Sequence, residues 1–244
     1  MRRHPPSSWR RRAALGVLTA ALAAGFFSPA RAQLGGSATL DTDARFRGVS
    51  LSDSRPSLRL TLNLDGAASW YAGASITRAN LVRDQRYEQV LGYAGAMTRA
   101  GPWLHLEFGA SASHFSGDSG DAHDASYDYV EPYVGVLGER WSTRLYYAPN
   151  YFGRHVQTAY LELDGHLLLT ERLRIFGHAG EIAALGGMRA HARRTRADLR
   201  IGSGLAVREF DLQIAWVAAQ RSGPYPAAFN GQRSTWVASV SYAF

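Results

Sequence analysis

The chain has 244 residues, of which 27 are basic and 20 acidic, and it contains no cysteine. Every basic residue is an arginine. The sequence therefore excludes disulfides, cysteine-bound zinc, thiol nucleophiles, Schiff-base lysines and a cysteine-linked lipid anchor.

The formal net charge of +7 is concentrated near the N-terminus, because residues 1–32 hold six arginines and no acidic residue. Residues 33–244 then carry a net charge of only +1. A nucleic-acid-binding domain needs a clustered basic surface, so we expect no nucleic acid among the partners.

Residues 1–32 have the three parts of a secretory signal peptide. Arginines precede an apolar run over residues 13–27, and Ala30-Arg31-Ala32 supplies the small residues that a signal peptidase requires. The alternative is an N-terminal membrane anchor, but the run is shorter than the roughly 20 residues that a spanning helix needs. We expect cleavage before Gln33 and one domain over residues 33–244.

The remainder of the chain predicts an all-β protein of about twelve strands, each close to the roughly 9–11 residues of a tilted membrane-spanning strand. The strands are expected near residues 37–47, 57–65, 67–78, 87–98, 102–114, 126–137, 140–149, 156–166, 171–180, 196–207, 209–219 and 234–244.

The strand near residues 57–65 shows the pattern most clearly. Its apolar and polar residues alternate strictly, with Leu58, Leu60, Leu62 and Leu64 set against Arg59, Thr61, Asn63 and Asp65. A period of two places the leucines on one face of a strand. We expect this face to contact lipid and the opposite face to contact water.

Short and long connections alternate along the chain. Short ones are expected at residues 65–66, 99–101, 138–139, 168–170 and 208–209, and longer ones at residues 48–56, 79–86, 115–125, 150–155, 180–195 and 220–233. This alternation is typical of antiparallel transmembrane β-barrels, which have short turns at one end and longer loops at the other.

A soluble sandwich or lipocalin-like barrel is the alternative, since its strands also alternate. Two observations favour the membrane barrel. The polar faces hold Gly, Ser, Tyr and charges of both signs, which suits a wet interior, and aromatic residues gather near strand ends, as in the interfacial belts of membrane proteins. The aromatic residues concerned are Trp70, Trp103, Trp141, Tyr147, Tyr151, Trp216 and Trp236.

The C-terminus resembles that of bacterial outer-membrane proteins, in which an aromatic residue ends an amphipathic last strand. Phe244 is the last residue, and Tyr242 precedes it on the same face. The resemblance implies that the barrel assembly machinery inserts this protein.

Several elements resemble the TorF-type family of outer-membrane porins. They are the stretch Ala38–Ser50 with Arg45 and Arg47, then Trp70–Gly73, Glu131-Pro132-Tyr133 and Tyr146–Tyr151. Ala44 stands where that family commonly has an aromatic residue. The resemblance implies a β-barrel in the outer membrane of a Gram-negative bacterium and passive transport, and it supplies no catalytic residues.

Charged residues on the predicted polar faces are the candidates for lining a pore. They are Asp41, Asp43, Arg45, Arg47, Arg59, Glu107, Glu131, Arg144, Glu162, Asp164, Arg172, Arg174, Asp198 and Arg200. Because both signs are well represented, no ion selectivity is predicted.

His105 and Glu107 share a face, and Glu131 is expected on the neighbouring strand. These residues could form a general acid–base cluster. The favoured interpretation is a network in the interior with Arg144, Arg172 or Arg174, because charges in a barrel interior need partners.

Two predicted loops carry charge runs. Asp118, Asp121, Asp124 and Asp128 lack the terminal glutamate of a calcium loop, so a solvated loop is expected there. Arg189, Arg193, Arg194 and Arg196 suit contact with the phosphates of lipopolysaccharide, with an ordinary solvated loop as the equal alternative.

The favoured function is a passive channel for small solutes in the outer membrane, with no enzymatic activity and no cofactor or metal. A rim-active lipid hydrolase or protease, and a filled structural or adhesive barrel, are the alternatives. A lumen blocked by tyrosine and arginine side chains would favour the filled barrel.

Overall fold

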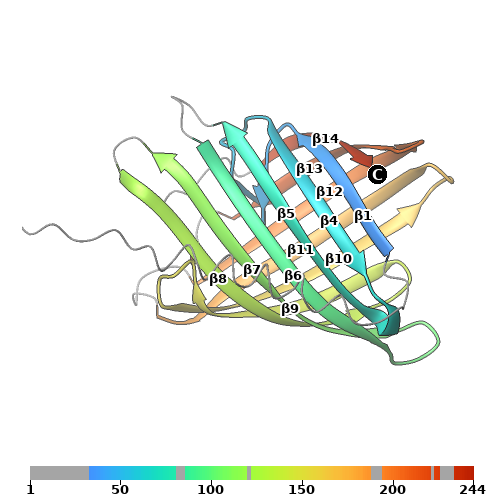
Figure 1. Cartoon of the computed structure of the whole chain (residues 1–244), viewed down its shortest axis with the longest axis horizontal. Helices are drawn as coiled ribbons and strands as arrows, with labels where there is room; N and C mark the ends of the chain where they lie inside the picture. The colour runs from blue at the N-terminus through green and yellow to red at the C-terminus, as the bar shows by residue number, and fades with distance from the viewer. Residues whose placement is uncertain (1–32, 81–85, 120–121, 188–193, 221–222, 226–233) are drawn as a thin grey trace, which may run out of the picture.

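The computed structural model describes residues 33–80, 86–119, 122–187, 194–220, 223–225 and 234–244, and it shows a closed antiparallel barrel (Figure 1). Twelve strands form the wall, as the sequence predicted. Within these ranges, no helix is long and apolar enough to cross a membrane. The predicted signal peptide, residues 1–32, lies outside the described residues.

The wall strands follow one another round the ring in chain order, and β1 pairs with β14 to close it. They are β1 (Gln33–Asp41), β4 (Ser57–Asp65), β5 (Trp70–Asn80), β6 (Arg86–Arg99), β7 (His105–Ser119), β8 (Ala122–Leu137), β9 (Trp141–Tyr151), β10 (Val156–Leu168), β11 (Leu173–Gly186), β12 (Thr195–Val207), β13 (Phe210–Ala219) and β14 (Ser234–Ala243).

The two ends of the barrel differ in their connections. At one end, here called the short-turn end, the connections are residues 66–69, 100–104, 138–140, 169–172 and 208–209, the first containing the 3-10 turn η2 (Ala67–Ser69). The opposite end is the long-loop end. Four connections there are shorter than predicted, because the strands continue further than expected. Residues 81–85, 120–121, 152–155 and 187–194 lie between strands where residues 79–86, 115–125, 150–155 and 180–195 were expected.

The leucine face of β4 points out of the barrel, as predicted. Leu60 and Leu62 are 47% and 53% exposed, whereas Arg59 and Thr61, at the alternate positions, are partly buried. Large apolar side chains are exposed in the same way on every one of the wall strands β7 to β14. A continuous exposed apolar surface of this kind, on a barrel without open edges, is suited to lipid.

Tryptophans lie on the outer surface towards both ends of the wall. Trp70 and Trp141 begin β5 and β9 at the short-turn end, and both are exposed. Trp216 and Trp236 are cross-strand partners on β13 and β14, near the long-loop end. This placement is typical of residues at the two membrane–water interfaces.

The last residue takes part in closing the ring. Phe244 and Gly36 exchange two backbone hydrogen bonds, of 2.9 and 3.0 Å. A Cβ atom on Gly36 would overlap the Phe244 ring, so glycine allows the ring to lie flat over β1. The Phe244 ring also stacks on Tyr242, with 6.2 Å between centroids.

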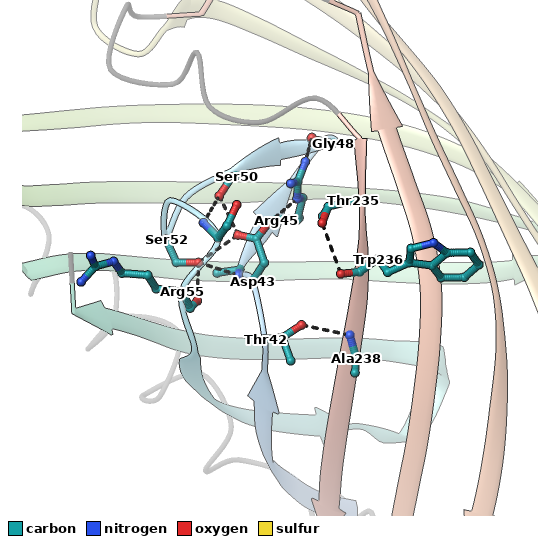
Figure 2. Close-up of polar contacts among 12 residues, drawn as sticks. Thr42, Asp43, Arg45, Gly48, Ser50, Ser52, Arg55, Thr235, Trp236 and Ala238 are labelled. Atoms are coloured by element: carbon teal, nitrogen blue, oxygen red, sulfur yellow. Dashed lines mark hydrogen bonds and ion pairs between the residues drawn. The ribbon is translucent and has the colours of Figure 1, made fainter. Parts of the chain in front are cut away.

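The chain leaves the wall earlier than predicted. The first strand was expected over residues 37–47, but β1 ends at Asp41. Residues 42–56, here called the inner segment, turn into the barrel and form a small two-stranded sheet of β2 (Arg45–Phe46) and β3 (Val49–Ser50). Figure 2 shows this segment beside β14, with the ring of Trp236 pointing away from it.

We expect Leu62→Arg to impair folding into lipid vesicles, because the new charge would face hydrocarbon near the middle of β4. The cost should be roughly 2–4 kcal/mol of unfolding free energy, measured by urea titration in vesicles. Thr61→Arg is the matched control on the adjacent inward position and should cost much less. Equal loss in both variants would contradict a lipid-facing leucine row.

We expect deletion of Phe244 to lower the amount of protein inserted in cells, because the residue both ends the predicted assembly signal and pairs with Gly36. Heat-modifiable mobility of membrane fractions at normal expression measures the inserted barrel. Phe244→Tyr, which keeps an aromatic ring, should insert as the parent does. Normal insertion of the deletion variant would contradict the assembly role.

Candidate functional site: the barrel interior

The inner segment is held in shape by Asp43. This buried carboxylate accepts hydrogen bonds from the hydroxyls of Ser50 (2.6 Å) and Ser52 (3.0 Å) through one oxygen. Its other oxygen accepts from Arg45 Nε at 2.7 Å, and Arg45 also donates to the Gly48 carbonyl. Figure 2 shows these side chains converging on Asp43, so one carboxylate fixes both strands of the small sheet.

The turn between β2 and β3 requires left-handed backbone. Arg47 and Gly48 have φ values of 47° and 72°. A Cβ atom at Gly48 would lie 2.7 Å from the Cβ atoms of both Asp198 and Ala219. Glycine is therefore needed twice over, for its conformation and for its close approach to β12 and β13.

Arg47 joins the inner segment to the far side of the barrel. Its guanidinium donates to both oxygens of Glu131 on β8, at 2.6 and 3.0 Å, and to the Tyr151 hydroxyl on β9 at 3.2 Å. It also lies 4.0 Å from the centre of the Tyr160 ring on β10. β8, β9 and β10 lie across the ring from β1 in the strand order, so the inner segment spans the lumen.

The electrostatics of Arg47 follow from this enclosure. The side chains of Arg47 and Glu131 are only 7% and 3% exposed. Burial is the largest single influence and lowers the pKa of Arg47, but the Glu131 carboxylate and the surrounding tyrosines together outweigh it and raise the pKa well above its ordinary value. A bidentate pair shielded from water is the strong form of this interaction, and losing either partner would leave a buried charge uncompensated.

A β-bulge aims Tyr151 inwards. The register between β9 and β10 shifts, because Tyr151 pairs with Val156 while Ala148 pairs with Thr158. Pro149 lies within the shift, where it has no backbone N–H to leave unpaired. The extra residue reverses the alternation beyond it, so Tyr151 faces Arg47 instead of lipid.

Aromatic side chains pack around this contact at the long-loop end. The rings of Phe115, Tyr129, Tyr151, Phe152 and Tyr225 lie within about 6 Å of one another in successive pairs, and most are completely buried. Burial raises the pKa of Tyr225 well above its ordinary value, so its hydroxyl stays neutral. The long-loop end of the interior therefore has an apolar core between the inner segment and the wall.

A second polar network lies nearer the short-turn end. Glu107 on β7 accepts from Arg144 Nε at 2.5 Å and from the Tyr71 hydroxyl at 2.5 Å. Arg144 also lies 3.5 Å from Glu162 on β10, and Glu162 accepts from the Tyr146 hydroxyl at 3.0 Å. This network links β5, β7, β9 and β10 across the lumen.

The proposed acid–base cluster is therefore not assembled. Glu107 and Glu131 are held by different arginines, Arg144 and Arg47. His105 is exposed at the start of β7. Of the three arginines predicted as partners, Arg144 contacts Glu107.

The remaining predicted pore-lining residues have other partners. Arg174 forms a double hydrogen bond with Asp211 on β13, at 2.6 and 2.9 Å. Arg59 lies 3.4 Å from Asp41, and Arg200 donates to Gln213 at 2.9 Å. Arg172 is exposed in the turn before β11, so it is not part of a wall strand.

Four residues that were expected in loops lie on strands instead, among them Asp118 on β7 and Asp124 on β8. Arg196 was expected in a basic outer loop, but it lies inside the barrel, 3% exposed, with its guanidinium 5.0 Å from the centre of the Tyr225 ring. Asp128 was expected in an acidic loop, but it lies on the outer face of β8 and contacts His114 at 2.5 Å. Asp121, Arg189 and Arg193 lie outside the described residues.

A cavity of about 350 Å³ lies in the interior near the short-turn end. Arg144, Asp164, His178 and Arg200 line it, and it extends to the turn residue Glu139. The sequence alone does not single out His178, because nothing in its neighbours along the chain shows that Asp164 and Asp198 flank it. Asp211 was missed for the same reason, whereas Tyr71 was expected in the lumen as one of the tyrosines that could block it.

We expect Arg47→Met to lower the unfolding free energy by about 3–5 kcal/mol, because it leaves Glu131 buried without its partner. Glu131→Gln should also be destabilising, and the double variant should lose less than the two single losses combined. Urea unfolding of the purified barrel in detergent measures all three. Additive losses would contradict a direct Arg47–Glu131 contact.

The fold matches known outer-membrane porins. A NanC porin structure aligns with a TM-score of 0.53 and 11% sequence identity, covering 86% of this chain and 99% of that one. The KdgM porin aligns with a TM-score of 0.51, 13% identity and coverages of 86% and 99%. The KdgM porin in complex with disordered oligogalacturonate aligns with a TM-score of 0.50 and 13% identity, covering 88% of this chain and 99% of that one. At these identities the likeness shows a shared fold.

The sequence comparisons identify the family. No curated protein sequence matches the chain. The TorF-type assignment stays a prediction. Residues 11–244 match the family described as "Bacterial protein of unknown function (Gcw_chp)", and because this match covers nearly the whole sequence, the chain belongs to that family.

Proposed function

We propose that this protein is a passive channel for small solutes in the outer membrane of a Gram-negative bacterium. The observation that carries the proposal is a closed barrel with an apolar outer face and a charged interior that holds a cavity of about 350 Å³. A polar interior is costly unless it is hydrated or internally paired, and a water-filled passage is the common reason for one in this architecture.

The inner segment is the proposed constriction of the channel. It crosses the lumen at the long-loop end and is fixed there by the Arg47–Glu131 pair. The cavity near the short-turn end is the wider part of the proposed path. Solutes would then meet arginines and carboxylates in roughly equal measure, which favours small polar molecules over ions of one sign.

The proposed orientation places the long loops outside the cell and both chain ends on the periplasmic side, as in other bacterial barrels. Lipopolysaccharide would then surround the long-loop end, where Arg194 is exposed. Insertion by the barrel assembly machinery is part of the same proposal and rests on Tyr242 and Phe244.

A filled structural or adhesive barrel is the second candidate. One observation favours it: the aromatic core around Tyr129 and Phe152 occupies the long-loop end of the interior. In that case the inner segment would be a permanent part of the core, and the outer loops would carry the function.

Shortening the inner segment separates the two candidates. Asp41 and Ser57 are direct cross-strand partners, so a Gly-Asn turn flanked by one serine on each side can replace residues 42–56 without changing the wall register. We expect the shortened barrel to show a several-fold larger single-channel conductance than the parent in planar bilayers, because the segment no longer crosses the lumen.

The control is a variant with the same turn chemistry introduced into residues 208–209, at the short-turn end, which should conduct as the parent does. Equal conductance of parent and shortened barrel would show that the inner segment is not the constriction. Absence of channels in both, in protein shown by heat-modifiable mobility to be folded, would overturn the channel and favour the filled barrel.

A further inference from the structure

Asp164 and His178 line the interior cavity, and together with Glu162 beside them they offer ligand atoms to a common point. Glu162 and Asp164 on β10 and His178 on β11 each contribute one such atom, and these atoms all lie within 4.8 Å of one another. A Zn²⁺ ion bonded at roughly 2.0–2.2 Å holds its ligand atoms about 3–4 Å apart. Small rotations of the three side chains would therefore close them around one ion.

The strand register explains why these groups meet. Asp164 pairs directly with His178, and Glu162 pairs with Gly180 one level further along β10 and β11. Gly180 pairs in turn with Asp198 on β12. Gly180 has no side chain, so it leaves a space between Glu162 and Asp198. The Tyr160 hydroxyl reaches into this space.

His178 has its Nδ1 atom towards Asp164 in the cluster and its Nε2 atom towards a carboxylate outside the cluster. Its Nδ1 lies 2.8 Å from Asp164, while its Nε2 lies 3.0 Å from Asp198 and 3.0 Å from the Tyr160 hydroxyl. Metal-bound histidines usually donate their other N–H to a carboxylate, which fixes the tautomer and the ring orientation. Asp198 is 6% exposed and stands in that place.

The local charge also suits a cation. Asp164 and Asp198 both form their ion-pair contact with His178. Glu162 lies 3.5 Å from Arg144, which is bonded more closely to Glu107 at 2.5 Å. Three further arginines are near enough to act electrostatically, Arg47 on Glu162, Arg200 on Asp164 and Arg196 on Asp198. Their guanidinium groups contact other partners, which are Glu131, Gln213 and the Tyr225 ring. Among the described residues, Asp164 and Asp198 thus form their ion pairs with His178 and not with an arginine.

Access and ligand type narrow the choice of ion. Asp164 and His178 line the cavity of about 350 Å³, so an ion held there keeps positions open for water. A nitrogen ligand with two carboxylates suits Zn²⁺, Co²⁺ or Mn²⁺ better than Ca²⁺ or Mg²⁺, which prefer oxygen alone.

We propose that Glu162, Asp164 and His178 form an exchangeable binding site for a divalent transition-metal cation inside the barrel, with Asp198 as the positioning residue for His178. The site does not depend on the proposed channel, since it needs only access to the cavity. The alternative to a bound metal ion is a protonated His178 that donates one hydrogen bond to Asp164 and one to Asp198.

Calorimetric titration of the folded, tag-free barrel in detergent with ZnCl₂ tests the proposal, and CoCl₂ adds a visible absorption band as a second readout. We expect one saturable site per barrel. His178→Asn and Glu162→Gln should abolish saturable binding. Asp198→Asn should weaken it by roughly 10–100-fold, as is usual for a carboxylate behind a histidine ligand.

His166→Asn is the matched control, because His166 lines the same cavity but lies outside the cluster. It should bind as the parent does. Heat-modifiable mobility selects variants that fold, and having two ligand variants on different strands keeps the test valid when one fails. No saturable binding by the parent, unchanged binding by folded His178→Asn, or loss in His166→Asn would each overturn the proposal.

Discussion

The pairing of β1 with β14 is the constraint on which the rest of the structure depends. A bilayer offers no hydrogen-bond partners to the backbone, so a sheet within it must close on itself. Once the ring is closed, every wall residue faces either lipid or the interior, and the alternation of β4 becomes the alternation of the whole wall. Phe244 and Gly36 complete this closure at the short-turn end.

Closure also determines how the charges are arranged. Charged residues cannot face the hydrocarbon, so they collect in a confined interior where each needs a partner. Arg47 with Glu131, Arg144 with Glu107, and Arg174 with Asp211 meet this need by joining strands that are far apart in the sequence. The same pairs stiffen the interior, while Asp164 and Asp198 contact His178 in place of an arginine.

The sequence was sufficient to predict the wall but not the contents of the barrel. Strict alternation in residues 57–65 reports directly on two environments, because every second side chain meets lipid. The same alternation continues through Asp41, Asp43 and Arg45, so nothing in the period shows that the chain leaves the wall after Asp41. The useful signals were Gly48 after Arg47 and the serine-rich stretch that follows, which indicate turns.

Contacts between distant strands could not be predicted from the sequence, for a different reason. Arg47 and Glu131 are 84 residues apart, and their meeting depends on the ring placing β8 opposite β1. The inward direction of Tyr151 depends on one bulge at Pro149, which reverses the face of every residue beyond it. A single-residue irregularity of this kind leaves no periodic trace, so Tyr151 was expected among the interfacial aromatics and instead lies against Arg47.

The backbone of the inner segment has a consequence for the order of events during assembly. Arg47, Asp53 and Ser54 all have positive φ values, a conformation that costs roughly 1–2 kcal/mol per residue without glycine. For Arg47, contacts with β8, β9 and β10 offset that cost, and these strands are synthesised long after the segment itself. The final shape of the segment therefore depends on the far wall through Arg47, which links the folding of the inner segment to the closure of the ring.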